Sequence, residues 1–78
     1  MTYIDLDKTD TKISGIYYGN RYNGIIERTT VMGDGNVQYH VRLQNMINVG
    51  TEKNHDYRSL ILIDHEKDYG KYVLGEAI

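Results

Sequence analysis

Apolar and polar residues alternate along much of the chain with a period of two, which is the pattern of half-buried β-strands. The clearest case is Asn36 to Gln44, where valine, tyrosine and leucine alternate with glutamine, histidine and arginine. The Asp34-Gly35 pair just before this segment favours a two-residue type I′ hairpin turn. The residues from Gly24 to Met32 are therefore predicted to form the antiparallel partner strand.

Other short segments carry weaker strand patterns. The run from Tyr57 to Asp64 is almost continuously apolar, which predicts a strand buried on much of both faces. Two segments, Asn45 to Asp56 and Asp64 to Asp68, leave room for a helical turn, but neither has the apolar stripe of a helix. The remaining strand candidates are Ile13 to Tyr18, Tyr69 to Leu74 and an edge strand at Tyr3 to Leu6.

The strand pattern and the length of the chain together predict the architecture. Five or six short strands in 78 residues, joined by tight turns, cannot cover both edges of an open sheet. We therefore expect residues 1–78 to form one all-β domain, a small five- to six-stranded antiparallel barrel.

The predicted hairpin places one arginine in a difficult position. With a two-residue turn, Glu27 faces Arg42 on the wet side, and Arg28 then points toward the core, where an unpaired guanidinium is costly. Either Arg28 extends from the rim of the barrel to water, or a β-bulge turns it to solvent. We favour the bulge, which would place Arg28 and Arg42 on one face, with Arg58 as a third member if its strand lies nearby.

Composition limits the functional classes. Nine basic and eleven acidic residues give a net charge of −2, which is too balanced for general attraction to nucleic acid or anionic lipid. The chain lacks cysteine, a signal-peptide pattern and any run of about 18 apolar residues, so a cytoplasmic protein without a membrane segment is expected.

The segment YYGNRYNG, residues 17–24, combines tyrosine and arginine with glycine and asparagine. Gly19 and Gly24 bracket what is predicted to be a loop, with Arg21 and Tyr22 at its tip. Tyrosine and arginine dominate binding hot spots, so the loop is a candidate contact site. The alternatives are that Tyr22 folds back over the core while Arg21 is solvated, or that the segment lines a small-ligand pocket. The predicted partner-binding residues are Tyr18, Asn20, Arg21, Tyr22, Asn23, Arg28, His40, Arg42 and Arg58.

Gly15 through Leu43, together with Arg58 to Ile63, resembles the SH3-like small barrels of the KOW and Tudor type in strand spacing and glycine placement. The resemblance implies a binding module, because such barrels grip peptides, nucleic acids or other domains. The short, cysteine-free composition, rich in tyrosine and asparagine, also resembles that of bacteriophage accessory proteins. That likeness implies a viral inhibitor of a host factor, acting in the host cytoplasm.

Signatures of catalysis are missing from the sequence. It contains no nucleophile elbow, phosphate-binding loop or dinucleotide fingerprint, so neither enzyme activity nor catalytic residues are predicted. The three histidines have no metal-ligand spacing, and no metal or other cofactor is expected.

These observations favour a non-catalytic module that binds a protein partner through the Gly19 to Gly24 loop, the wet face of Gln38 to Gln44 and the Asn45 to Asp56 loop. The main alternative is a nucleic-acid-binding barrel that uses the arginines with nearby tyrosines. Two further alternatives are a structural homo-oligomer and a small-ligand sponge.

Overall fold

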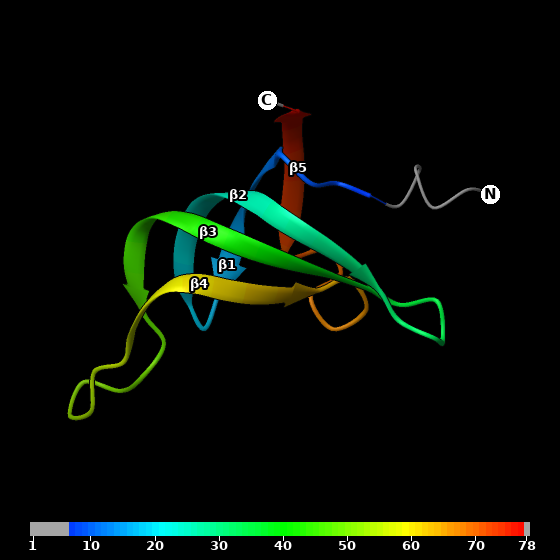
Figure 1. Ribbon diagram of the computed structural model, residues 1–78. Helices are drawn as coiled ribbons and strands as arrows, with labels where there is room; N and C mark the ends of the chain where they lie inside the picture. The colour runs from blue at the N-terminus through cyan, green and yellow to red at the C-terminus, as the bar shows by residue number, and fades with distance from the viewer. Residues whose placement is uncertain (1–6, 78) are drawn as a thin grey trace.

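Five β-strands make up the fold in a computed structural model, which describes residues 7–77 (Figure 1). Every pairing between them is antiparallel. The predicted all-β class is confirmed, whereas the strand expected at Tyr3 to Leu6 lies outside the described residues. The strands are β1 (Thr11–Tyr17), β2 (Asn20–Val31), β3 (Val37–Asn48), β4 (Tyr57–Asp64) and β5 (Tyr72–Ala77).

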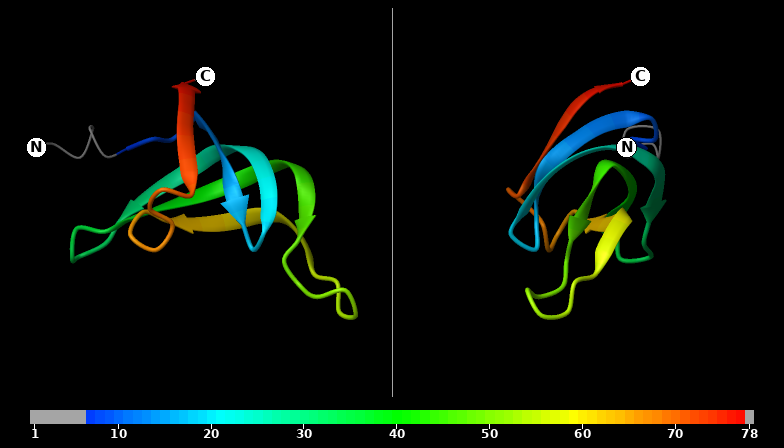
Figure 2. Two further views of the ribbon diagram at one scale, coloured as in Figure 1. Left: turned by 180° about the vertical axis from the view of Figure 1, so that it is seen from behind. Right: turned by 90° about the vertical axis from the view of Figure 1, so that its left-hand side faces the viewer.

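The strands form one sheet in the order β4-β3-β2-β1-β5. The sheet curls strongly, so that β5 runs across the direction of β3 and β4 (Figures 1 and 2). The curl brings Tyr39 of β3 and Tyr72 of β5 into an edge-to-face contact with ring centroids 5.8 Å apart. Within the described residues no strand pairing joins β4 to β5, so closure of the barrel stays a prediction.

The core lies inside this curl, where one face of each strand is apolar. Ile26, Val41 and Ile63 are its largest fully buried side chains. Burial of each such side chain contributes roughly 1.5–3 kcal/mol, so this one layer carries most of the stability. The buried apolar residues are Ile13, Tyr22, Ile26, Val37, Tyr39, Val41, Leu43, Ile47, Ile61 and Ile63.

The predicted loop from Gly19 to Gly24 is wrong, because β2 already begins at Asn20. The turn consists of Tyr18 and Gly19, whose φ angles are 50° and 76°. Positive φ at both central residues is the mark of a type I′ turn, which allows Tyr17 to pair directly with Asn20. The strand therefore starts four residues earlier than the glycine spacing predicts.

Tyr22 is buried rather than exposed at a loop tip, and only 4% of its surface is accessible. It lies opposite Gly15 in the β1–β2 pair, on the face that looks into the core. Of the two alternatives for this tyrosine, packing over the core is the one that the structure adopts. Its neighbour Arg21 lies on the other face and is exposed.

The β2–β3 connection is one residue longer than predicted. Met32 N donates to Asn36 O (2.7 Å), and Gly35 has a φ of 90°. Gly33 and Asp34 thus form the turn and Gly35 follows in the left-handed region, which is the common three-residue hairpin loop. Val31 consequently lies opposite Val37, and the predicted two-residue turn is wrong.

The bulge expected beside Arg28 is confirmed. The β2–β3 register shifts between Ile26 and Arg28, which turns Arg28 to solvent opposite His40. The expected ion pair between Glu27 and Arg42 also forms, although the bulge leaves Glu27 without a direct cross-strand partner.

The bounds predicted for β4 are confirmed, but its burial on both faces is wrong. Ile61 and Ile63 are buried, whereas Tyr57, Leu60 and Leu62 are 57%, 52% and 41% exposed. β4 is an edge strand of an antiparallel sheet, and the described chain covers only one of its faces.

The other element bounds shift by a few residues. β3 continues to Asn48, so the predicted Asn45 to Asp56 loop is reduced to residues 49–56. β1 runs from Thr11 to Tyr17, and β5 starts at Tyr72 instead of Tyr69. A helical turn at Asp64 to Asp68 is confirmed by the Asp68 N to Asp64 O hydrogen bond of 2.8 Å.

Asp64 organises the connection from β4 to β5. Its Oδ1 accepts hydrogen bonds from Asn36 Nδ2 (2.9 Å), Glu66 N (3.0 Å) and Lys67 N (3.1 Å). These bonds, the one from Asn36 above all, lower the pKa of Asp64 from its ordinary 3.8 to about 2. The folded state therefore favours the ionised carboxylate.

A pH dependence follows from this lowered pKa. The stabilisation by the Asp64 carboxylate is present above the ordinary pKa and is lost as pH falls from about 4 toward about 2. We expect Asp64→Asn to lower stability at pH 7 and to flatten the acid dependence, as measured by urea unfolding at a series of pH values. An equally steep acid loss in the variant would contradict this role.

Candidate partner-binding surface

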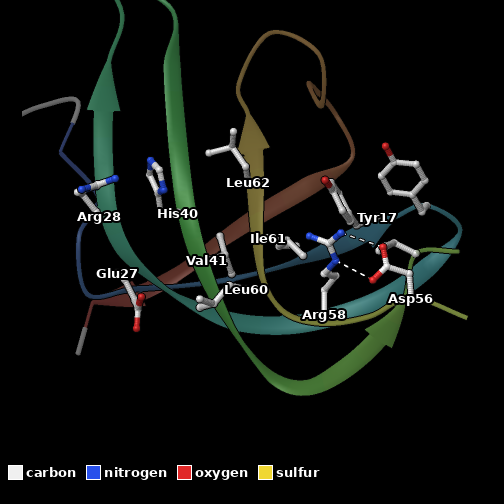
Figure 3. Close-up of a pocket in the computed structure, with 12 residues that line it drawn as sticks. Tyr17, Glu27, Arg28, His40, Val41, Asp56, Arg58, Leu60, Ile61 and Leu62 are labelled. Atoms are coloured by element: carbon white, nitrogen blue, oxygen red, sulfur yellow. Dashed lines mark hydrogen bonds and ion pairs between the residues drawn. The ribbon is translucent and has the colours of Figure 1, made fainter.

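A groove with a volume of about 820 Å³ lies along β4. It is called the β4 groove here, and its principal residues are Tyr18, Arg28, His40, Arg58, Leu60 and Leu62. Arg28 and His40 lie on one side of Leu62, and Tyr17 and the Arg58–Asp56 pair lie on the other (Figure 3). The groove thus combines apolar, aromatic and charged side chains from β2, β3, β4 and the β1–β2 turn.

Tyr18 is the most exposed aromatic residue of the β4 groove, with 72% of its surface accessible. Its ring meets Tyr17 edge to face, with centroids 4.8 Å apart. Tyr17 is half-buried, and burial is the main cause of its raised pKa. The φ of 50° at Tyr18 is uncommon for a bulky residue and stores local strain. Glycine or asparagine would suit this turn better, so the fold alone does not explain a tyrosine here.

The charges of the β4 groove are unequally compensated. Arg58 donates from Nε and Nη2 to the two oxygens of Asp56 at 2.9 and 2.8 Å, and the bond lowers the pKa of Asp56. Among residues 7–77 the only other ion pair is that of Arg42 with Glu27. Arg28 therefore has no carboxylate partner in the described chain, and its positive charge is available to a ligand.

Leu60 and Leu62 form the apolar centre of the groove. They alternate along β4 with the buried Ile61 and Ile63, so they project from the opposite face of the sheet. Leu60 lies beside Arg42 and Leu62 beside His40 in the β3–β4 pair. Two leucines on an edge strand leave a continuous apolar strip in contact with water.

The predicted site residues divide into groups. Tyr18, Arg28, His40 and Arg58 are brought together in the β4 groove. The other predicted site residues lie elsewhere. Asn23 and Arg42 line a second depression of about 660 Å³, Arg21 is exposed, and Tyr22 belongs to the core. Asn20 also lies outside the β4 groove.

Asn20 has a structural role in the described chain. Its Nδ2 donates to Tyr18 O at 3.0 Å and to Asn48 O at 2.7 Å, so it ties the β1–β2 turn to the end of β3. Arg42 is held by Glu27 on the outer face. Arg28 and Arg42 lie on one face of the sheet as expected, because Arg28 pairs with His40, which is two residues from Arg42 on β3. Of the three arginines, only Arg28 and Arg58 border the β4 groove.

The sequence interpretation missed Tyr17, Leu60 and Leu62 as site residues. The run YRSLILID suggested burial on two faces, and nothing in its composition shows that the strand lies at an edge. A signal was present in the alternation of leucine with isoleucine, since β-branched residues pack well inside sheets.

Two further properties of the described chain concern metal binding and membrane spans. Residues 7–77 contain no group of three or more histidine, aspartate or glutamate side chains placed to hold a metal ion. In the same part of the chain, no helix has the length and apolar character needed to cross a membrane.

Comparisons with known proteins gave no match, whether against family models, curated proteins or solved structures. The resemblance to SH3-like barrels and to bacteriophage proteins therefore stays a prediction. The chemistry of the β4 groove is the basis for the functional argument.

Proposed function

We propose that this protein is a non-catalytic binding module that engages a protein partner through the β4 groove. The observation that carries the proposal is the meeting of Tyr18, Arg28 and two exposed leucines on one edge of the sheet. Large aromatic and arginine side chains around an apolar centre are the usual composition of a binding hot spot.

The charge balance favours a protein over a nucleic acid. Arg58 and Arg42 are each paired with a carboxylate, which leaves Arg28 as the one uncompensated arginine of the β4 groove within the described residues. A nucleic-acid surface needs several phosphate contacts from free basic groups, and the chain as a whole carries a net charge of −2. A partner with an acidic group beside an apolar patch fits this groove better.

The composition supports a more specific role. If the chain is a bacteriophage accessory protein, its partner is a host protein in the host cytoplasm, which it inhibits by covering a functional surface. A small rigid sheet is suited to that task, because little conformational entropy is lost when a preorganised surface binds.

The variant Tyr18→Asn/Arg28→Ala tests the proposal. Asparagine tolerates the positive φ of residue 18, so the fold should be retained. We expect capture of partner proteins from a bacterial cell extract to weaken at least about tenfold, since two hot-spot side chains are removed. The matched control is Arg21→Ala/Tyr69→Ala, which removes the same two residue types from exposed positions outside the groove. Equal loss of capture in both variants would contradict the proposal.

A gel-shift titration with single-stranded DNA and RNA distinguishes nucleic-acid binding from the proposed protein binding. Phosphate contacts weaken steeply as salt rises, whereas an interface centred on tyrosine and leucine changes little. Binding that requires Arg28 and collapses at moderate salt would favour the nucleic-acid function over the proposed one.

A further inference from the structure

The free edge of β4 carries main-chain groups that the described chain does not pair. His65 N donates to Val37 O (2.8 Å) across the β3–β4 ladder. Main-chain groups alternate in direction along an antiparallel strand, so the N–H and C=O groups of Leu60 and Leu62 point away from β3. They are the donors and acceptors with which another chain can pair.

A hollow of about 640 Å³ continues the β4 groove toward the turn that follows β4. Tyr17, Tyr18 and Leu62 line both depressions. Tyr17 lies on the side of β4 that faces away from His40 (Figure 3). The two depressions together are called the edge trough here, and its walls are the free edge of β4 and the tyrosines at the β1–β2 turn.

The β1–β2 turn limits what can pair with β4. Neighbouring strands of a sheet lie about 4.8 Å apart, so a chain paired with β4 lies between Leu62 and the two tyrosines. The edge strand of a second copy would bring its own sheet behind it, and that sheet would meet the turn. A single extended segment has no further strand on its outer side, so it fits between the two walls.

The side chains of the edge trough indicate the chemistry of its occupant. Leu60 and Leu62 make the middle of the β4 wall apolar. The four carboxylates that border the trough are each bonded within the chain: Glu27, Asp56, Asp64 and Asp68. Three bordering cations have no carboxylate partner among residues 7–77: Arg28, Lys67 and Lys71. The charge left for an occupant is therefore positive, which acidic side chains complement.

We propose that the protein partner contributes an extended segment of about five residues, apolar at its centre and acidic at the end beside Lys67 and Lys71, which pairs with the free edge of β4 as a sixth strand. The inference rests on the proposed function and names the part of the partner that is recognised. A nucleic acid does not supply the alternating N–H and C=O groups that this edge needs.

Synthetic peptides test the pairing directly. The probes are fluorescently labelled Thr-Val-Thr-Val-Thr-Glu-Glu and the reversed sequence Glu-Glu-Thr-Val-Thr-Val-Thr, which together cover both directions of the added strand. We expect one of them to bind in fluorescence anisotropy, and replacement of its glutamates by lysines to weaken binding at least about tenfold. No saturable binding of either acidic peptide up to about 1 mM would overturn the inference.

N-methylation of the bound peptide separates strand pairing from contact through side chains alone. Successive amides of an added strand alternate between facing β4 and facing away. Methylation of the two valine amides and methylation of two threonine amides should therefore differ, with one isomer losing at least about tenfold in affinity and the other losing little. Equal affinity of the two isomers would contradict the added strand.

Leu62→Pro removes one N–H donor from the edge of β4. Proline is tolerated where a strand N–H faces outward, so the β3–β4 ladder should be retained, as circular dichroism can verify. The matched control is Leu62→Ala, which loses the leucine side chain but keeps the donor. We expect the proline variant to bind the acidic peptide about tenfold more weakly than the alanine variant. Equal binding by the two would overturn the inference, and the methylated peptides decide if the proline variant does not fold.

The proposed function and this inference fail in different ways. If Tyr18→Asn/Arg28→Ala loses partner capture while Leu62→Pro and Leu62→Ala capture equally well, the β4 groove binds through side chains and the added strand is wrong. Sedimentation equilibrium tests the remaining occupant. Twice the single-chain mass of 9.0 kDa, reverting to that mass in Leu62→Pro, would assign the edge to a second copy and overturn the inference.

Discussion

Tyr22→Ala is expected to lower the free energy of unfolding by about 3–5 kcal/mol, the cost of removing a large side chain from a core. Tyr22 is only 4% exposed and belongs to the main hydrophobic cluster. A domain of this size has a total stability of roughly 4–12 kcal/mol, so the loss is a large share of it. Urea unfolding followed by circular dichroism measures the change.

Tyr22→Phe separates the contribution of the ring from that of the hydroxyl. The hydroxyl is buried and has no hydrogen-bond partner among the described residues. The same burial raises the pKa of Tyr22 to about 12. We expect phenylalanine to preserve stability or to increase it by about 1 kcal/mol, because an unsatisfied polar group is removed. A loss as large as that of alanine would show that the hydroxyl makes a stabilising bond.

Gly15→Ala is expected to have the second large effect on the free energy of unfolding, because β5 approaches β1 closely at this position. A Cβ on Gly15 would lie 2.3 Å from Lys71 O and 2.9 Å from Tyr72 Cα. Both contacts are with backbone, so β5 must move as a unit. We expect a loss of about 3 kcal/mol, at the upper end of the cost of overpacking.

The matched control for Gly15→Ala is Gly33→Ala. A Cβ at Gly33 meets no atom within 4 Å, and its φ is not positive. This variant should unfold at the same urea concentration as the wild type, to within about 0.5 kcal/mol. Equal destabilisation by the two alanines would contradict the close contact between β1 and β5.

The sequence predicts the parts of the fold that depend on local pattern. Alternation along β3 identifies it as a half-buried strand, and the cost of burying Arg28 predicts the bulge in β2. The turn at Tyr18 and Gly19 is not predictable in the same way, because tyrosine rarely adopts a positive φ. The glycine and asparagine residues from Gly19 to Gly24 predicted the turn there instead, but Asn20 and Asn23 are part of β2.

The candidate site is predictable only in part, and the reason is topology. Tyr18, Arg28, His40 and Arg58 were expected to contact a partner, and the curled sheet gathers all four in the β4 groove. The apolar residues of β4 do not reveal which strand lies at the edge of the sheet. Whether β4 lies at the edge depends on the order of all five strands in the sheet. Because β4 is an edge strand, Leu60 is exposed.

The central claim of this account is that the open side of β4 is a contact surface. Its most direct test is amide hydrogen exchange at Leu60 and Leu62, followed by NMR with and without captured partner. The account predicts that both amides exchange rapidly in the free protein and become protected when the partner is bound, while Ile61, whose N–H faces β3, stays protected throughout. Equally rapid exchange at Leu60 and Leu62 with the partner bound would contradict it.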